Sequence, residues 1–151
     1  MSIKRIKLGA GVLLVACLAL PQYTCSKYVG PDGKTVISVP TGAAQGAYRE
    51  VLERHYPLES FEVLDIFSWL ILLTFVWPLP VLAYHWRGKP AVLKRAVWLA
   101  EPILAIGSAY GVWELSSVGT RAIGTYLALA ANSVYLCAWV VDLGHKPRQR
   151  G

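Results

Sequence analysis

The chain has little of what a soluble enzyme or a disulfide-bonded secreted domain requires. Only 16% of its 151 residues are charged, whereas about a quarter is usual for a soluble globular protein. It has three cysteines, an odd number that excludes a complete disulfide framework. No catalytic, nucleotide-binding or metal-ligand motif stands out. The sequence therefore predicts no enzyme, no cofactor and no metal site.

The chain does contain four strongly apolar runs. They cover residues 8–26, 66–86, 103–113 (extended back to 96 if Glu101 is tolerated) and 122–141. The hydrocarbon core of a bilayer, about 30 Å thick, requires about 20 apolar residues per helix, and a helix satisfies its own backbone hydrogen bonds in lipid. We predict an all-α membrane protein: an antiparallel four-helix transmembrane bundle with a small extracytoplasmic β-hairpin and helix between helices one and two.

Basic residues are concentrated on one side of this bundle. Ten positive charges share that side with a single acid, Asp142: Lys4, Arg5, Lys7, Arg87, Lys89, Lys94, Arg95, Lys146, Arg148 and Arg150. Basic residues in short loops favour the cytoplasmic side. The pattern predicts a bacterial inner-membrane protein with both termini in the cytoplasm. The basic residues are then topological determinants rather than a nucleic-acid surface.

The same pattern divides the chain into four segments. Residues 1–21 form an N-terminal transmembrane helix or signal anchor, and residues 22–62 are periplasmic. Residues 63–145 form a three-helix transmembrane region, and residues 146–151 form a basic cytoplasmic tail.

The first apolar run allows three interpretations. Its dense part, residues 8–20, has a length that is also typical of a signal peptide. Leu14-Val15-Ala16-Cys17 resembles a lipobox, which would make Cys17 a lipidation site, but apolar residues continue beyond the cysteine. A retained helix, a lipoprotein signal and ordinary cleavage all leave residues 22–62 outside the cytoplasm.

The outer segment has hairpin and helix signals. Gly30-Pro31-Asp32-Gly33 separates two runs of strand-favouring residues, which predicts a hairpin. Residues 43–56 place Tyr48, Leu52 and Tyr56 on one side at helical spacing. This pattern predicts an amphipathic helix whose apolar side packs on the membrane or bundle, or docks a partner protein.

Three polar residues are predicted to lie at a similar depth inside the membrane. Glu101 and Asn132 each lie about ten residues from the inner face, or about 15 Å, and Thr74 lies at a comparable depth. Intramembrane acids usually face a bundle interior or a watery cavity. Glu101 and Asn132 are predicted to form either a hydrogen-bonded clamp between helices or a proton or solute relay.

Small residues and prolines add packing information. Gly107 and Gly111 form a GxxxG match, and Gly124, Ala128 and Asn132 follow at fourfold spacing. Small residues permit close helix approach, so the third and fourth helices are predicted to pack tightly. Pro78 and Pro80 are expected to kink the second helix and Pro102 the third.

Two functional classes follow from these features. The first is a non-enzymatic accessory, assembly or immunity-type subunit of a membrane complex, with a membrane-protein partner or a second copy of itself. The second is a transport or proton-coupling component that uses Glu101 and Asn132.

Overall fold

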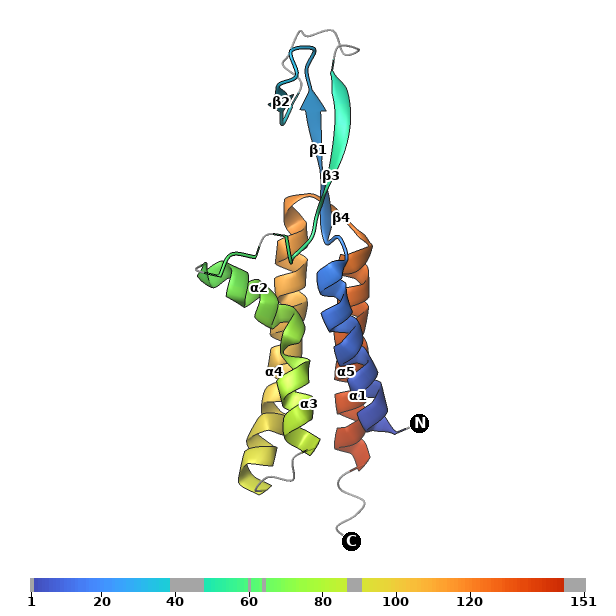
Figure 1. Ribbon diagram of the computed structural model, residues 1–151. Coiled ribbons are helices and arrows are strands. Elements are labelled where there is room, and N and C mark those ends of the chain that lie inside the picture. The colour runs from blue at the N-terminus through green and yellow to red at the C-terminus, as the bar shows by residue number, and fades with distance from the viewer. Residues whose placement is uncertain (1, 39–47, 60, 64, 87–90, 146–151) are drawn as a thin grey trace.

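The computed structural model describes residues 2–38, 48–59, 61–63, 65–86 and 91–145 as a helical bundle with a β-sheet projecting from one end (Figure 1). The helices are α1 (Ile3–Ala16), α2 (Ile66–Val76), α3 (Pro78–Trp86), α4 (Ala91–Leu115) and α5 (Ile123–His145), with 3₁₀ turns η1 (Cys17–Ala19) and η3 (Ser116–Val118). The strands are β1 (Tyr23–Val29), β2 (Thr35–Val36), β3 (Arg49–His55) and β4 (Thr120–Arg121). The architecture is mixed α/β, which corrects the all-α prediction.

Two helices are long and apolar enough to cross a membrane, over Arg95–Val118 and Ile123–Gly144. Helices α2 and α3 provide a third candidate span if they are counted together, although they are bent by 53° relative to one another. The bend lies next to Pro78, whose missing N–H interrupts the helical ladder as predicted.

Helix α4 continues through Pro102 as one helix, and the kink expected there stays a prediction. Helix α1 has only 14 residues, fewer than a bilayer crossing needs on length alone. The described chain therefore has two or three candidate spans rather than four.

The hairpin predicted around the Gly-Pro-Asp-Gly turn is present. Strands β1 and β2 are antiparallel, with Tyr28 opposite Val36 and Val29 opposite Thr35. Gly33 has a φ of 75°, a left-handed conformation that glycine adopts without the steric cost of a Cβ. The Gly33 N–H donates to the Gly30 carbonyl at 2.9 Å and closes the turn.

The predicted outer helix is wrong over Arg49–His55, which is strand β3. This strand runs antiparallel to β1 from Tyr23 opposite His55 to Val29 opposite Arg49. Residues 43–47 lie outside the described ranges. Spacing along one segment cannot reveal that β1 offers a complementary edge, whereas an isolated helix of this length is marginal in water. Lys27 of β1 forms an ion pair with Glu53 across the two strands.

A compact polar junction joins the sheet to the bundle. The Gln22 side-chain amide donates to the Cys17 carbonyl at 2.8 Å, at the end of α1. The Thr125 hydroxyl in α5 donates to the Gln22 carbonyl at 2.5 Å, and the Gly124 N–H donates to the Pro21 carbonyl at 3.0 Å. The base of β1 is thus bonded to both helices.

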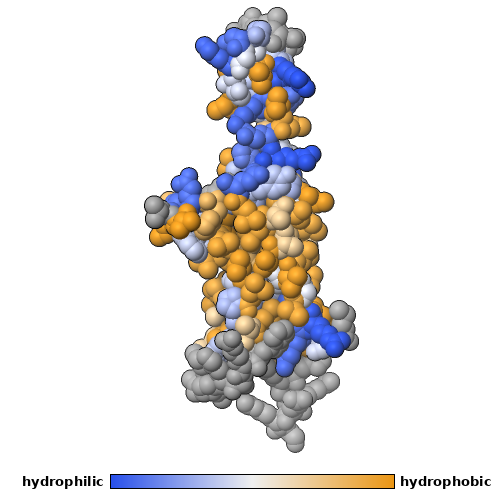
Figure 2. Space-filling model, in the orientation of Figure 1, coloured by the Kyte–Doolittle hydropathy of each residue, from blue (hydrophilic) through white to orange (hydrophobic). Residues whose placement is uncertain are grey.

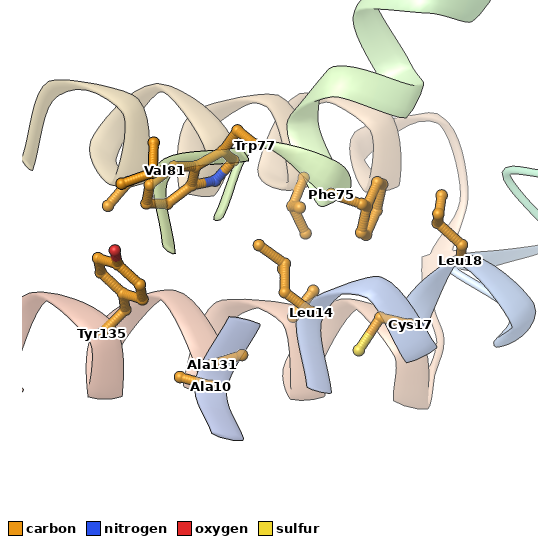
Figure 3. Close-up of a cluster of buried hydrophobic side chains, with 12 residues drawn as sticks. Ala10, Leu14, Cys17, Leu18, Phe75, Trp77, Val81, Ala131 and Tyr135 are labelled. Carbon is orange, nitrogen blue, oxygen red and sulfur yellow. The ribbon is translucent and has the colours of Figure 1, made fainter. Parts of the chain in front are cut away.

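Small and aromatic side chains fill the bundle interior (Figure 3). Leu14 of α1, Phe75 of α2 and Tyr135 of α5 are each at most 2% exposed. Gly11 allows α1 to approach α3, because a Cβ there would lie 3.0 Å from the Pro78 Cβ. Lipid is as apolar as such a core, so close packing rather than water exclusion holds membrane helices together.

The surface of the molecule changes polarity along its long axis. Figure 2 shows an apolar band over the bundle, with hydrophilic residues over the sheet and at the opposite end. Large apolar side chains that are more than half exposed occur on α2, α4 and α5: Ile66, Phe67, Leu70, Leu73, Leu99, Ile103, Ile106, Tyr110, Ile123, Tyr126 and Val140. An apolar band this extensive indicates a membrane or protein contact.

Candidate functional site

The bundle encloses an ion pair between its first and fourth helices. Lys7 lies in the second turn of α1 and Glu101 lies near the middle of α4. The Lys7 ammonium donates to Glu101 Oε2 at 2.5 Å. The side chains are 8% and 0% exposed, respectively. The pair therefore ties α1 to α4 inside the molecule.

Aromatic side chains complete the surroundings of this pair. The Tyr135 hydroxyl of α5 donates to Glu101 Oε2 at 3.4 Å. Lys7 Nζ lies 5.4 Å from the Tyr135 ring centroid, within the range of a cation–π attraction. Trp77, at the break between α2 and α3, packs edge-on against Tyr135 with 5.0 Å between ring centroids; Figure 3 shows these two rings facing each other. We call Lys7, Glu101, Tyr135 and Trp77 the core cluster.

Each residue of the ion pair neutralises the buried charge of the other. An isolated charge in a low-dielectric interior is costly, and a buried pair is tolerated when its geometry is close and further hydrogen bonds support it. The Glu101 carboxylate accepts from an ammonium and from a phenol at one oxygen. Removing either charged partner would leave the other buried and uncompensated.

One buried polar atom of Trp77 and one of Asn132 have no hydrogen-bond partner among the described residues. They are the Trp77 indole N–H and Asn132 Oδ1, a donor and an acceptor. Asn132 precedes Tyr135 by one helical turn and is 1% exposed. Buried polar groups of this kind are commonly satisfied by an internal water.

The structure places the predicted polar residues differently from the depth argument. Glu101 is fully buried, but the predicted bond with Asn132 is absent from the described contacts. Asn132 Nδ2 instead donates to the Ala128 carbonyl in its own helix at 3.1 Å. The Thr74 hydroxyl donates to the Leu70 carbonyl, and the Thr74 carbonyl accepts from the Ser108 hydroxyl at 2.6 Å. Thr74 thus joins α2 to α4 rather than entering the core cluster.

Lys7 is the member of the site that sequence reasoning missed. The charge pattern groups Lys7 with the basic residues of the inner face, whereas its side chain turns into the bundle. A signal was available, because Lys7 shares helical spacing with Ala10, Gly11 and Leu14, the other buried residues of α1. A basic residue on the small-residue face of a membrane helix indicates an internal acidic partner.

The four predicted packing residues do not share one helix interface. Gly111 packs against α2, since a Cβ there would lie 3.1 Å from the Thr74 side chain, and Gly107 has nothing within 4 Å of that position. Gly124 faces the junction, where a Cβ would lie 2.5 Å from Gln22 Nε2. Ala128 is fully buried in the core.

The predicted docking residues lie on the projecting sheet or at its base. Leu52, in the middle of β3, is 66% exposed. Tyr48 and Tyr56 flank the strand and are partly buried. The Tyr48 ring lies close to Gly30, because a Cβ at Gly30 would be 3.1 Å from Tyr48 Cε1.

Cys17 is buried at 0% exposure in η1, within the core that α1 forms with the other helices. Figure 3 shows Cys17 among the buried side chains, and its carbonyl accepts from the Gln22 side chain at the junction. Across the described ranges, no three His, Cys, Asp or Glu side chains are grouped so that they could hold a metal ion.

Comparison with protein-family models, curated proteins and solved structures found no match to this chain. Two features of the molecule itself bear on its function: the core cluster and the sheet that projects from the bundle.

Proposed function

We propose that this chain is a small integral membrane protein that acts as a non-enzymatic accessory, assembly or immunity-type subunit by presenting its sheet to a partner. The observation that carries the proposal is the way the sheet is mounted. It projects beyond the apolar band (Figures 1 and 2), and Gln22 binds its base to α1 and α5. A recognition element gains affinity when it is held rigidly, because less freedom is lost on binding.

The proposed setting is a bacterial inner membrane, with both termini in the cytoplasm and residues 22–62 in the periplasm. The start of α1 and the end of α5 lie at the end of the bundle away from the sheet (Figure 1). Ten basic residues are assigned to that side. Lys7 pairs with Glu101 inside the bundle, so nine of them are left as topological determinants. A reporter fused after Gly151 should be cytoplasmic, and one inserted at Gly33 should be exported. An exported Gly151 fusion contradicts the orientation.

Helix α1 is proposed to remain in the mature protein as the short fourth helix of the bundle. Removing it would take away Lys7 and leave Glu101 buried without the ammonium that neutralises it. It would also uncover the core on which Leu14 and Cys17 pack. Intact-mass measurement of the purified protein tests this, since lipidation or cleavage at Cys17 would change the mass by a defined amount.

The function is tested by copurification in mild detergent with paired substitutions on the sheet. Leu52→Asp alters an exposed side chain of β3, and Ile37→Asp alters one that is 87% exposed just after β2. We expect a stoichiometric partner with the wild-type chain and with Ile37→Asp, and its loss with Leu52→Asp. A wild-type particle that contains no other protein, or a partner retained equally by both variants, would contradict the proposal.

A second function, proton or solute coupling, is favoured by one specific observation. The core cluster contains a buried ion pair, and among the described residues a donor on Trp77 and an acceptor on Asn132, one helical turn before Tyr135, have no partner. Proton flux into proteoliposomes that contain a trapped pH dye tests it. Flux that requires Glu101 and is lost in Glu101→Gln would support coupling, and absence of flux with the wild-type chain would leave the ion pair as a structural contact.

A further inference from the structure

Strand β3 offers an open hydrogen-bonding edge. Strand β1 is paired along one edge with β3 and along the other with β2 and β4. In the part of the chain that the structure describes, β3 pairs with β1 alone. Its outer edge therefore presents unpaired backbone N–H and C=O groups along Arg49–His55. Such an edge is a template for adding a strand from another chain.

The side chains of β3 give this edge a charge pattern. Glu50, Leu52 and Arg54 alternate along one face of the strand, so a large apolar side chain lies between an acid and a base. All three are exposed. On the opposite face, Glu53 is already bound to Lys27 and lies 3.8 Å from His55. Glu50 and Arg54 form no ion pair within the described ranges, so they are the charges available to a partner.

A second copy in the same membrane does not fit this pattern. The strands run along the long axis of the bundle (Figure 1). Two copies related by a two-fold axis normal to the membrane would therefore pair their β3 strands in parallel and in register. Glu50 would then face Glu50 and Arg54 would face Arg54, and like charges placed directly opposite are destabilising. An antiparallel pair of β3 strands would match the charges but would invert the second bundle.

We propose that the outer edge of β3 binds an extended segment of a different protein, which adds to the sheet as a further strand. That segment places a basic side chain opposite Glu50, an apolar one opposite Leu52 and an acidic one opposite Arg54. This inference rests on the proposed interaction function and specifies the chemistry of the partner. Backbone hydrogen bonds supply affinity, and the alternating side chains supply specificity.

Three synthetic peptides test the charge pattern on the purified full chain in detergent. Their central residues are Glu-Thr-Val-Thr-Lys, Glu-Thr-Val-Thr-Glu and Lys-Thr-Val-Thr-Lys, and binding is followed by fluorescence anisotropy. The wild-type chain should prefer the mixed-charge peptide. Glu50→Lys should prefer the acidic peptide, and Arg54→Glu should prefer the basic one. Each preference over the peptide that differs at one charged residue should be about fivefold, because one attractive cross-strand pair is replaced by a like-charge pair.

The substitutions are chosen so that the sheet remains intact. Glu50 and Arg54 are exposed and make no described ion pair, so circular dichroism and thermal unfolding should be unchanged. A peptide with proline in place of the central valine serves as the control for strand addition, since proline cannot donate to the ladder. It should bind at least tenfold more weakly than its parent.

The outcomes that overturn the inference are distinct from those that overturn the proposed function. If no peptide binds at millimolar concentration, the charges merely protect the edge from aggregation and the inference fails. It also fails if affinity does not follow the charge reversals. A dimer in detergent that is cross-linked through Leu52→Cys would show that a second copy occupies the edge. The copurification test is independent of these results. A partner that copurifies with the wild-type chain and is lost with Leu52→Asp would still support the interaction function.

Discussion

Two lysine–glutamate pairs among the residues that the structure describes lie in opposite surroundings, and their comparison shows what holds each region together. Lys7–Glu101 lies inside the bundle, with side chains 8% and 0% exposed, whereas Lys27–Glu53 lies on the sheet, with side chains 42% and 43% exposed. Removing one partner of a buried pair leaves an uncompensated charge. An exposed pair contributes little, because water solvates both groups and salt screens them.

The other side chains also differ in burial between the two regions. In the bundle, small and aromatic side chains pack closely around Tyr135 and Phe75. The sheet has a backbone ladder and only partly buried side chains on β1 and β3. A small sheet of this kind is marginal without support, and the Gln22 junction provides that support. The bundle thus fixes the sheet, and the sheet contributes surface rather than stability.

The largest expected effect comes from breaking the buried pair. Lys7→Met or Glu101→Leu alone should lower the unfolding free energy by about 3–5 kcal/mol, because a charge remains buried without its partner. Glu101→Gln should also destabilise, since it leaves the Lys7 ammonium unneutralised. The double variant Lys7→Met/Glu101→Leu should recover much of the loss. Thermal unfolding in detergent measures all four.

Lys27→Met is the matched control for this comparison. It removes the same type of side chain from an exposed pair and should change the unfolding temperature far less than Lys7→Met does. Equal losses for the two lysine variants, or strict additivity of the Lys7 and Glu101 substitutions, would mean that the buried pair is not an energetic contact.

The second prediction concerns the junction between the two regions. Gly124→Ala introduces a Cβ 2.5 Å from Gln22 Nε2 and 2.6 Å from the Pro21 carbonyl oxygen. Overpacking of this kind should cost about 1–3 kcal/mol and increase hydrogen exchange at the base of β1. Gly107→Ala is the control, because nothing lies within 4 Å of its Cβ position; it should be neutral or slightly stabilising. Destabilisation by both would indicate a general helix effect instead of the junction.

The third prediction separates Asn132 from the ion pair. Asn132 bonds only to its own helix in the described contacts, and its Oδ1 has no partner there. Asn132→Leu should therefore shift the unfolding free energy by less than about 1 kcal/mol, since removing an unsatisfied buried polar group offsets the loss of the local bond. A loss as large as that of Glu101→Leu would show that Oδ1 is bonded to an internal water or to the carboxyl group.

The parts of the fold that local signals determine were predictable. The Gly30–Gly33 turn and the apolar runs of α4 and α5 act within a few residues or along one helix, so their sequences suffice. Strand β3 was missed because its partner β1 is distant in the chain, and residues 48–56 satisfy helical spacing as well. The choice between helix and strand depended on the energy of pairing with β1, and the sequence of a single segment does not reveal that energy.

For the candidate site, the sequence predicted the buried acid but not its partner. Depth along the helices identified Glu101 as a buried acid, because distance from the membrane face follows from counting residues. Its partner depends on which way each helix is rotated, and depth contains no information about rotation. Lys7 therefore replaced Asn132 as the partner of Glu101. The small-residue face shared by Lys7 and Ala10 was the local clue to that rotation.

The smallest expected effect is the pH response of the exposed pair on the sheet. The hydrogen bond and charge of Lys27 hold the pKa of Glu53 below its usual value of 4.5, despite a smaller opposing effect of desolvation. A lowered folded-state pKa means that the carboxylate contributes stability above the unfolded-state pKa. That contribution is lost as the pH falls through the folded value. The sheet should therefore loosen slightly in acid, below about pH 4.5, while the buried contacts of the bundle persist.

Carboxyl ¹³C chemical shifts of Glu53, followed by NMR between pH 2 and 7, measure this directly. Lys27→Met should raise the Glu53 pKa toward its usual value. Asp65 is the internal control, because its pKa is lowered chiefly by the Phe67 backbone N–H, with Ser68 also donating to it, and Lys27→Met should leave it unchanged. An unchanged Glu53 titration in Lys27→Met would show that the surface pair is not maintained in solution. In that case only the buried Lys7–Glu101 pair would be a real contact, and Lys27–Glu53 would not be a weak contact but none at all.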